Sequence, residues 1–117
     1  IFRQGVIPQA REMFEDCIRS AQEAGLTMAV VFAVEGMASL NVSQGHLECA
    51  MQLFAWTDAM REEIGDTRPS VEKASVEKDL EVIRSKIDIM EITHLSVEGR
   101  SMTVEQAIHL ALDRTDE

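Results

Sequence analysis

The side chains best able to do chemistry in this chain are histidines, cysteines and carboxylates at helical spacing. Glu91 and His94 form a Glu-x-x-His pair, which places both side chains on one face of a helix. Paired copies of this motif hold two metal ions in some helical bundles. Only one copy occurs here, and the nearest similar pair, Glu105 with His109, has i,i+4 spacing. Because such a centre needs several converging ligands, we interpret His94 as a partly exposed histidine beside an acidic residue and predict no metal site.

Residue patterns typical of nucleophilic catalysis are not found in the sequence. Cys17 has no histidine at a neighbouring helical position, and His46, three residues before Cys49, lies at a predicted helix start, where polar residues are expected. The sequence has no Gly-rich phosphate-binding loop with a lysine. Two cysteines cannot form a disulfide framework, and both lie among apolar residues, where cysteine packs as a small hydrophobe. We therefore expect two reduced core thiols, no cofactor and no enzymatic activity.

Charge and hydropathy restrict the classes of partner. The chain has 117 residues, enough for one domain, and a formal net charge of −10. Such a surface repels phosphate backbones and anionic membranes, so we expect neither nucleic acid nor membrane as a partner of this segment. The acidic balance favours a basic or amphipathic partner.

The apolar runs and the first residues of the chain bear on its cellular location. The longest apolar run, at 28–34, is too short to cross a bilayer, and the first residues lack the features of a secretory signal. We expect a cytoplasmic location. Because the chain opens on Ile1, we also expect it to be a piece of a longer protein or a matured chain.

The elements that must position these side chains are helices, because nearly the whole chain shows helical periodicity and no stretch shows sustained strand alternation. Pro8 and Pro69 both fit the first turn of a helix. Breaks are expected at Gly25, at Gly45 and at the stretches 65–69 and 98–101, since glycine readily adopts the left-handed conformation that ends a helix. The predicted helices lie near 8–24, 27–43, 46–64, 70–87, 89–97 and 103–114. Thr103 and Gln106 form a capping box at the start of the last one.

A possible dimerisation element lies between Val76 and Met90. Its apolar residues have the 4, 3, 4, 3 spacing of a heptad seam. Arg84 and Asp88 would form an i,i+4 pair in the same helix. A coiled coil needs about three or four heptads, and only two are present. A helix packed on its own chain is therefore favoured, and a homodimer through this seam is the alternative. The seam comprises Val76, Leu80, Ile83, Ile87 and Met90.

Two stretches forty residues apart, 5–25 and 45–65, repeat one pattern. A repeat of this size is typical of stacked helical hairpins, each of which covers the apolar face of its neighbour. The order of glycine, alanine, aromatic residue and small residue resembles the second helix of a tetratricopeptide repeat. Gly36 resembles the glycine at the close helix crossing in the first helix of that repeat. The matching pairs are Gly5 and Gly45, Ala10 and Ala50, Phe14 and Phe54, Glu23 and Glu63, and Gly25 and Gly65.

A second resemblance covers residues 34–112. Residues 34–65 resemble the repeat near the C-terminus of large bacterial signal-transducing ATPases, including LuxR-type transcription regulators. Pro69, the helix through Ile87, the Gly99-Arg100 pair and the segment 102–112 then follow in the order typical of that family. The chain departs from the family pattern at Ile87-Asp88 and at Ser96, so the short helix is free to pack differently or to continue from the helix before it. The matching residues within 34–65 are Glu35, Gly36, Gln44, Gly45, Ala50, Leu53, Ala59, Arg61, Ile64 and Gly65.

These observations predict an all-α, tetratricopeptide-like stack of antiparallel helical hairpins with C-terminal capping helices. The chain would be one helical-repeat domain over 1–117, with repeat units at 5–25 and 27–65 and capping helices at 69–114. We expect an interaction or effector-sensing scaffold of a multidomain bacterial regulator, which binds a protein or peptide, such as another domain of its parent chain. By the tetratricopeptide resemblance, the residues that would line the concave, partner-binding face are Thr27, Val31, Glu35, Ala38, Asn41 and Val42.

Overall fold

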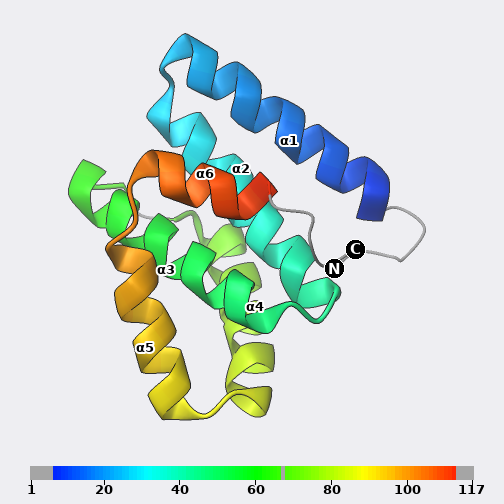
Figure 1. Cartoon of the computed structure of the whole chain (residues 1–117), viewed down its shortest axis with the longest axis vertical. Coiled ribbons are helices and arrows are strands. Elements are labelled where there is room, and N and C mark those ends of the chain that lie inside the picture. The colour runs from blue at the N-terminus through cyan, green and yellow to red at the C-terminus, as the bar shows by residue number, and fades with distance from the viewer. Residues whose placement is uncertain (1–6, 67, 113–117) are drawn as a thin grey trace.

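Helices joined by short turns account for nearly all of the computed structural model, which describes residues 7–66 and 68–112. The all-α class is confirmed over these residues (Figure 1). Each described end of the first four helices lies within one residue of its predicted position. Residues 113 and 114, predicted to end the last helix, lie outside the described residues. The helices are α1 (Ile7–Ala24), α2 (Thr27–Ser43), α3 (Leu47–Ile64), α4 (Ser70–Lys86), α5 (Ile89–Arg100) and α6 (Val104–Leu112).

Glycines end the first three helices, as the sequence predicts. Gly25, Gly45 and Gly65 have φ values of 70°, 84° and 83°. This left-handed conformation strains residues with a Cβ atom, which explains why glycine occupies each position. Gly25 and Gly65 are equivalent in the repeated pattern, so the described parts of the two stretches fold alike as a helix followed by a left-handed glycine. Gly5 lies outside the described residues.

The helix α5 extends through Gly99 and Arg100, three residues beyond its predicted end. Gly99 does not break the helix, because its role is to permit a close approach to α3. A Cβ atom at this position would lie 2.3 Å from the backbone oxygen of Gln52. The break follows at 101–103, where the predicted capping box is confirmed. There the Gln106 backbone N–H donates to Thr103 Oγ1 (3.1 Å), and the Thr103 N–H donates to Gln106 Oε1 (2.9 Å).

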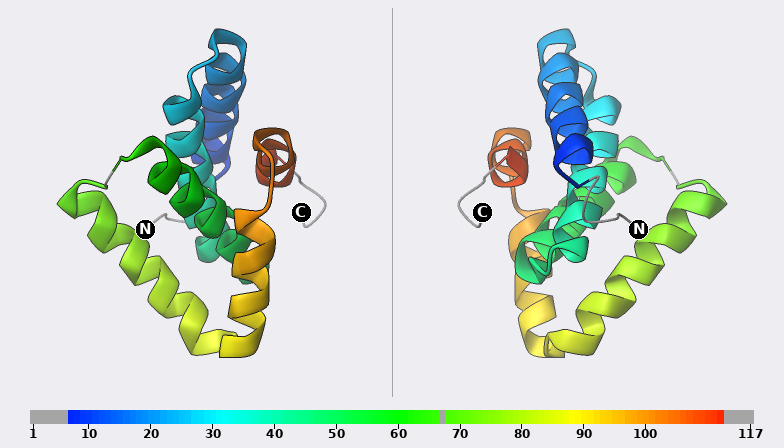
Figure 2. Two further views of the ribbon diagram at one scale, coloured as in Figure 1. Left: turned by 90° about the vertical axis from the view of Figure 1, so that its left-hand side faces the viewer. Right: turned by 90° about the vertical axis from the view of Figure 1, so that its right-hand side faces the viewer.

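The order of helix packing differs from a regular stack at α4. The helix α1 packs along α2, α2 along α3, and α3 along α5, whereas α4 contacts α2 and α3 at few positions. Figure 2 shows α4 running away from the body and meeting α5 at an acute angle. The helix α6 packs across α2 and α3. In a regular hairpin stack α3 would pack along α4, so the tetratricopeptide-like stack is not confirmed.

The core lies around α2 and α3. Because α2 has α1, α3, α4 and α6 around it, it buries residues on most of its sides. The largest fully buried side chains are Trp56 and Phe54 of α3, and both belong to the core. The radius of gyration is 13.2 Å, as expected for a compact domain. Within the described residues, no helix is both long enough and apolar enough to cross a lipid bilayer.

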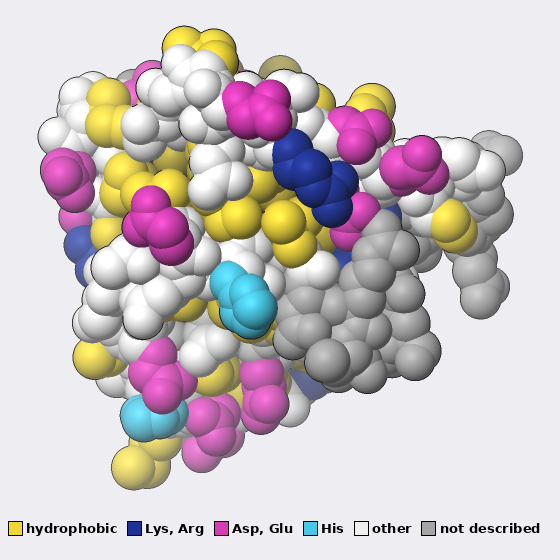
Figure 3. Space-filling model, turned by 45° about the horizontal axis from the view of Figure 1, so that its top comes forward, with side chains coloured by type: hydrophobic (Ala, Val, Ile, Leu, Met, Phe, Trp, Pro, Cys, Tyr) yellow, Lys and Arg dark blue, Asp and Glu magenta, His cyan; other side chains and the backbone are white. Residues whose placement is uncertain are grey.

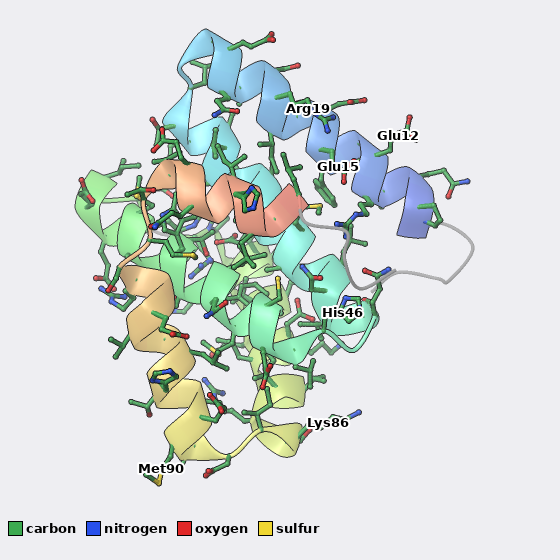
Figure 4. All side chains as sticks on the ribbon, in the orientation of Figure 1. Glu12, Glu15, Arg19, His46, Lys86 and Met90 are labelled. Atoms are coloured by element: carbon green, nitrogen blue, oxygen red, sulfur yellow. The ribbon has the colours of Figure 1, made fainter. Side chains whose placement is uncertain are left out.

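The heptad seam packs mainly within the chain. Ile83 is fully buried, and Val76, Leu80 and Ile87 pack against the core. Met90 remains 77% exposed and projects at the turn between α4 and α5 (Figure 4). The helix α4 ends at Lys86, so the last two seam residues, Ile87 and Met90, lie beyond it.

The predicted pair of Arg84 with Asp88 is wrong, because Asp88 lies beyond the end of α4. The Asp88 side chain caps α5 by accepting a hydrogen bond from the Met90 N–H (3.3 Å). Arg84 instead lies 3.8 Å from Glu77.

Candidate interaction site

An apolar groove between α1 and α2 is the candidate interaction site, and we call it the α1–α2 groove. Its volume is about 550 Å³, which is within the usual range for binding pockets. Nearly all of its lining is apolar. It is lined by Phe14, Cys17, Ser20, Ala21 and Ala24 of α1, by Leu26 of the turn, and by Ala29, Phe32 and Ala33 of α2.

Helical spacing and side-chain size create this groove. Along α1 the residues 14, 17, 21 and 24 recur on one helix face. Ala21 and Ala33 are each only 4% exposed and lie deep in the groove, where their small size leaves the space open. Leu26 and Phe32 are 58% and 47% exposed. Large apolar side chains grouped at an exposed site are typical of interaction surfaces.

The crossing between Phe14 and Gly36 holds the two walls of the groove together. A Cβ atom on Gly36 would lie 2.4 Å from Phe14 Cε1, so the aromatic ring occupies the space that glycine leaves. This confirms the prediction that Gly36 lies at a close helix crossing.

Phe32 connects the groove to a group of charged side chains. It lines both the α1–α2 groove and a smaller pocket between α2 and α4. The guanidinium carbon of Arg61 lies 5.0 Å from the centre of the Phe32 ring, a cation–π distance. The conformation of this groove residue is therefore tied to a buried arginine.

Glu35 is the centre of these charged residues, which we call the Glu35 network. Its carboxylate is 8% exposed and accepts hydrogen bonds from Arg61 (3.1 and 3.2 Å) and from Arg68 (2.9 and 2.6 Å). Arg61 also pairs with Asp66, and Arg68 lies 2.6 Å from Asp58. Burial lowers the pKa of Arg68, but hydrogen bonds and charge attraction from Glu35 and Asp58 outweigh it and leave that pKa raised. The network ties α2, α3 and the segment before α4 together.

The pocket between α2 and α4 contains a partly buried carboxyl group. Ser39 Oγ donates a hydrogen bond to Asp79 Oδ2 (2.9 Å). Burial raises the pKa of Asp79, and the hydrogen bond from Ser39 opposes this effect. The pocket has a volume of about 230 Å³, which is below the usual size of a ligand site.

The six residues predicted to bind a partner do not line the α1–α2 groove. Thr27 is exposed and Val42 is half-buried, but the other four are buried. The cause is the position of α2, because neighbouring helices cover most of its sides. Partner binding by these residues stays a prediction, although burial leaves only Thr27 and Val42 with accessible side chains. The buried four are Val31 and Ala38, both 0% exposed, Asn41 at 5% and Glu35 at 8%.

The sequence contains the small residues that form the groove, in rows on one face of α1 and of α2. An apolar face of this kind predicts burial, and for this reason the sequence predicts that both cysteines lie in the core. Cys17 is exposed and lines the groove, so that prediction is wrong for this residue, and Cys49 is only partly exposed. Neither cysteine is in a disulfide. Helical periodicity identifies an apolar face but not whether another element covers it.

Glu91 and His94, the pair with the spacing of a metal-binding motif, lie on the exposed side of α5. The His94 side chain is 68% exposed, and its Nε2 atom lies 3.4 Å from Glu98, one turn further along α5. Over residues 7–66 and 68–112, no group of three or more His, Cys, Asp or Glu side chains could hold a metal ion.

Comparisons of the chain with protein-family models, curated proteins and solved structures found no significant match. The tetratricopeptide and bacterial-regulator resemblances therefore stay predictions, and a functional proposal has to come from the α1–α2 groove and its surroundings.

Proposed function

We propose that this domain is a protein-interaction module that binds a partner in the α1–α2 groove and catalyses no reaction. The observation that supports this most is an open apolar groove bordered by two exposed large side chains, Leu26 and Phe32. Covering these side chains on binding would remove apolar surface from water, which is the main driving force of association.

The groove is pre-formed, which favours binding. Phe14 and Gly36 hold α1 against α2, and the Glu35 network holds α2 against α3. A partner would therefore not have to order these helices, and less free energy would be lost on association.

The predicted biological context is compatible with this proposal. A scaffold from a multidomain bacterial regulator would use such a groove for another domain of its own chain or for a separate protein. Oligomerisation through the heptad seam has less support, because four of its five residues pack into the core of the same chain.

Selection from a displayed random-peptide library tests the proposal. We expect the pure domain to enrich a convergent set of apolar peptides, whose binding is then measured by fluorescence anisotropy. Ala24 is an exposed groove residue, so Ala24→Glu should fold normally and weaken binding by about tenfold or more, because a charge is then buried without a partner.

Ala74→Glu is the matched control, since Ala74 is an exposed alanine on α4 outside the groove. It should leave peptide binding unchanged. If nothing is enriched, or if Ala24→Glu binds the peptides as well as the unaltered domain does, the proposal is wrong.

A further inference from the structure

We infer that the occupant of the α1–α2 groove is a short amphipathic α-helix with basic residues beside its apolar face. This inference depends on the proposed function and adds the chemical class of the partner. Three observations carry it: the apolar lining of the groove, its length, and the charge along its edge.

The lining argues for a helix over an extended peptide. Beside Cys17, Ser20 offers the only polar side chain among the lining residues. An extended peptide in this groove would bury backbone N–H and C=O groups without hydrogen-bond partners, which costs free energy. A helix forms these hydrogen bonds within itself, so it can enter an apolar groove without this cost.

The length of the groove fits a few helical turns. Phe14 and Ala24 mark the extent of its lining along α1, a distance of roughly 15 Å at the rise of an α-helix. A partner helix of about ten residues would span it and present anchors at positions i, i+3 or i+4, and i+7. The small side chains of Ala21 and Ala33 leave room for large anchors such as leucine or phenylalanine.

The charge along the edge argues for a basic partner. Asp16 and Glu23 are exposed on α1, four residues before and three residues after the groove residue Ser20, so helical spacing places both beside the lining of the groove. Arg19 lies 3.6 Å from Asp16, but both side chains are more than half exposed, so this pair is screened by solvent. On the face drawn in Figure 3, carboxylates lie around the hydrophobic side chains, with some basic and histidine side chains among them, and the chain has a net charge of −10. Lysines or arginines on the partner would complement this field.

The same charges argue against a second copy of the chain as the occupant. Two copies would bring two acidic edges together, and each chain carries a net charge of −10. Like charges placed opposite each other oppose association. A partner of opposite sign is therefore favoured over self-association.

Designed peptides provide the probes. One peptide carries leucines at i, i+4 and i+7 with lysines on the flanking positions, the second replaces each lysine by glutamate, and the third keeps the lysines but has a proline in its centre. We expect the lysine peptide to bind at least about tenfold more tightly than either of the others, and its binding to weaken as salt rises. Binding is measured by fluorescence anisotropy.

The location of binding is read from Cys17. This exposed thiol lines the groove, so the lysine peptide should slow its reaction with a thiol reagent. The Cys17→Ser variant identifies which reaction phase belongs to Cys17, and the partly exposed Cys49 is an internal reference that the peptide should not protect.

Charge variants test the role of the edge. Asp16→Asn together with Glu23→Gln should narrow the preference for the lysine peptide over the glutamate peptide. Glu81→Gln together with Glu91→Gln, exposed carboxylates on α4 and α5, is the matched control and should leave this preference unchanged.

The outcomes separate this inference from the proposed function. Equal binding of the lysine and glutamate peptides, or tight binding of the proline peptide, would overturn the basic helix while the library selection could still support an interaction module. A dimer seen by light scattering and dissociated by Ala24→Glu would assign the groove to a second copy and also overturn the inference. Failure of all peptides together with an unsuccessful library selection would overturn both proposals.

Discussion

Two buried or partly buried carboxyl groups, Glu35 and Asp79, differ in how well their surroundings stabilise the charged form. Glu35 is buried, but two arginines compensate its charge. Asp79 is partly buried and receives one hydrogen bond from a hydroxyl group. Because Ser39 carries no charge, burial dominates, and the pKa of Asp79 lies above its usual value.

The raised pKa of Asp79 predicts a pH dependence of stability. Below the unfolded-state pKa, Asp79 is protonated in both states. As pH rises through the higher folded-state pKa, ionisation opposes folding, so the stability contributed by this group falls. Asp79→Asn removes this effect. We expect the melting temperature of the variant, relative to the unaltered chain, to rise from about pH 3 to about pH 7.

Glu62→Gln is the control for this measurement, because the pKa of Glu62 is shifted in the opposite direction to that of Asp79. A hydrogen bond and charge attraction from Arg100 lower the pKa of Glu62. Its ionised form therefore stabilises the fold above the unfolded-state pKa, and this contribution is lost as pH falls. The relative melting temperature of Glu62→Gln should fall as pH rises. Parallel pH profiles for the two variants would contradict the assignment.

Pairs of helices are held at close distance by glycines at two crossings. At the α1–α2 crossing, Gly36 faces the side chain of Phe14, and at the α3–α5 crossing, Gly99 faces the backbone oxygen of Gln52. A Cβ atom added at Gly36 would meet a side chain, whereas one added at Gly99 would meet a backbone atom. Mutation can shorten the side chain but cannot remove the backbone atom.

A double-mutant cycle tests this difference. Gly36→Ala should destabilise the chain by about 1–3 kcal/mol, because its Cβ atom would collide with the Phe14 ring. In a Phe14→Ala background the collision is removed, and Gly36→Ala should stabilise by about 1 kcal/mol through its better helix propensity. Urea unfolding measures each free energy.

Gly99→Ala is the contrasting variant in this experiment. It should be destabilising in every background, including Gln52→Ala, because the side chain of Gln52 is not the obstacle. Additive effects of Gly36→Ala and Phe14→Ala would show that the two residues do not form the crossing.

At the scale of the whole molecule, two features distinguish this helix arrangement from a regular stack of hairpins. The helix α3 packs along α5, so α4 is left with few contacts to the body. The Glu35 network then connects α2 and α3 to the segment that leads into α4. A single carboxylate thus contributes to the arrangement of three helices.

Glu35→Gln should therefore lower the free energy of unfolding by about 1–3 kcal/mol, because Arg61 and Arg68 lose the buried carboxylate they share and keep only their less buried partners Asp66 and Asp58. This loss is a large fraction of the stability of a typical domain, so chemical unfolding should be followed at low temperature. Glu48→Gln changes an exposed glutamate on α3 and should alter stability by no more than about 0.5 kcal/mol. Equal midpoints for the two variants would contradict a structural role for the network.

Much of the local structure could be predicted from the sequence. The helical period and the glycines at 25, 45 and 65 located the first helices closely, and the Thr103–Gln106 capping box was correct. The end of α5 was placed too early, because a glycine that permits a close crossing was interpreted as a helix break. Within the candidate site, Gly36 was correctly placed at a crossing, whereas Cys17 was wrongly placed in the core.

The sequence by itself determined which segments are helical and where most of them end, because hydrogen bonds within a helix, caps and glycine conformations involve residues only a few positions apart. Only the tertiary structure decided which apolar faces are covered. The face of α2 that carries Val31 and Ala38 is buried, whereas the one that carries Phe32 stays partly open. This difference depends on where α1, α3, α4 and α6 pack around α2, which is decided by contacts distant in sequence that no local pattern specifies.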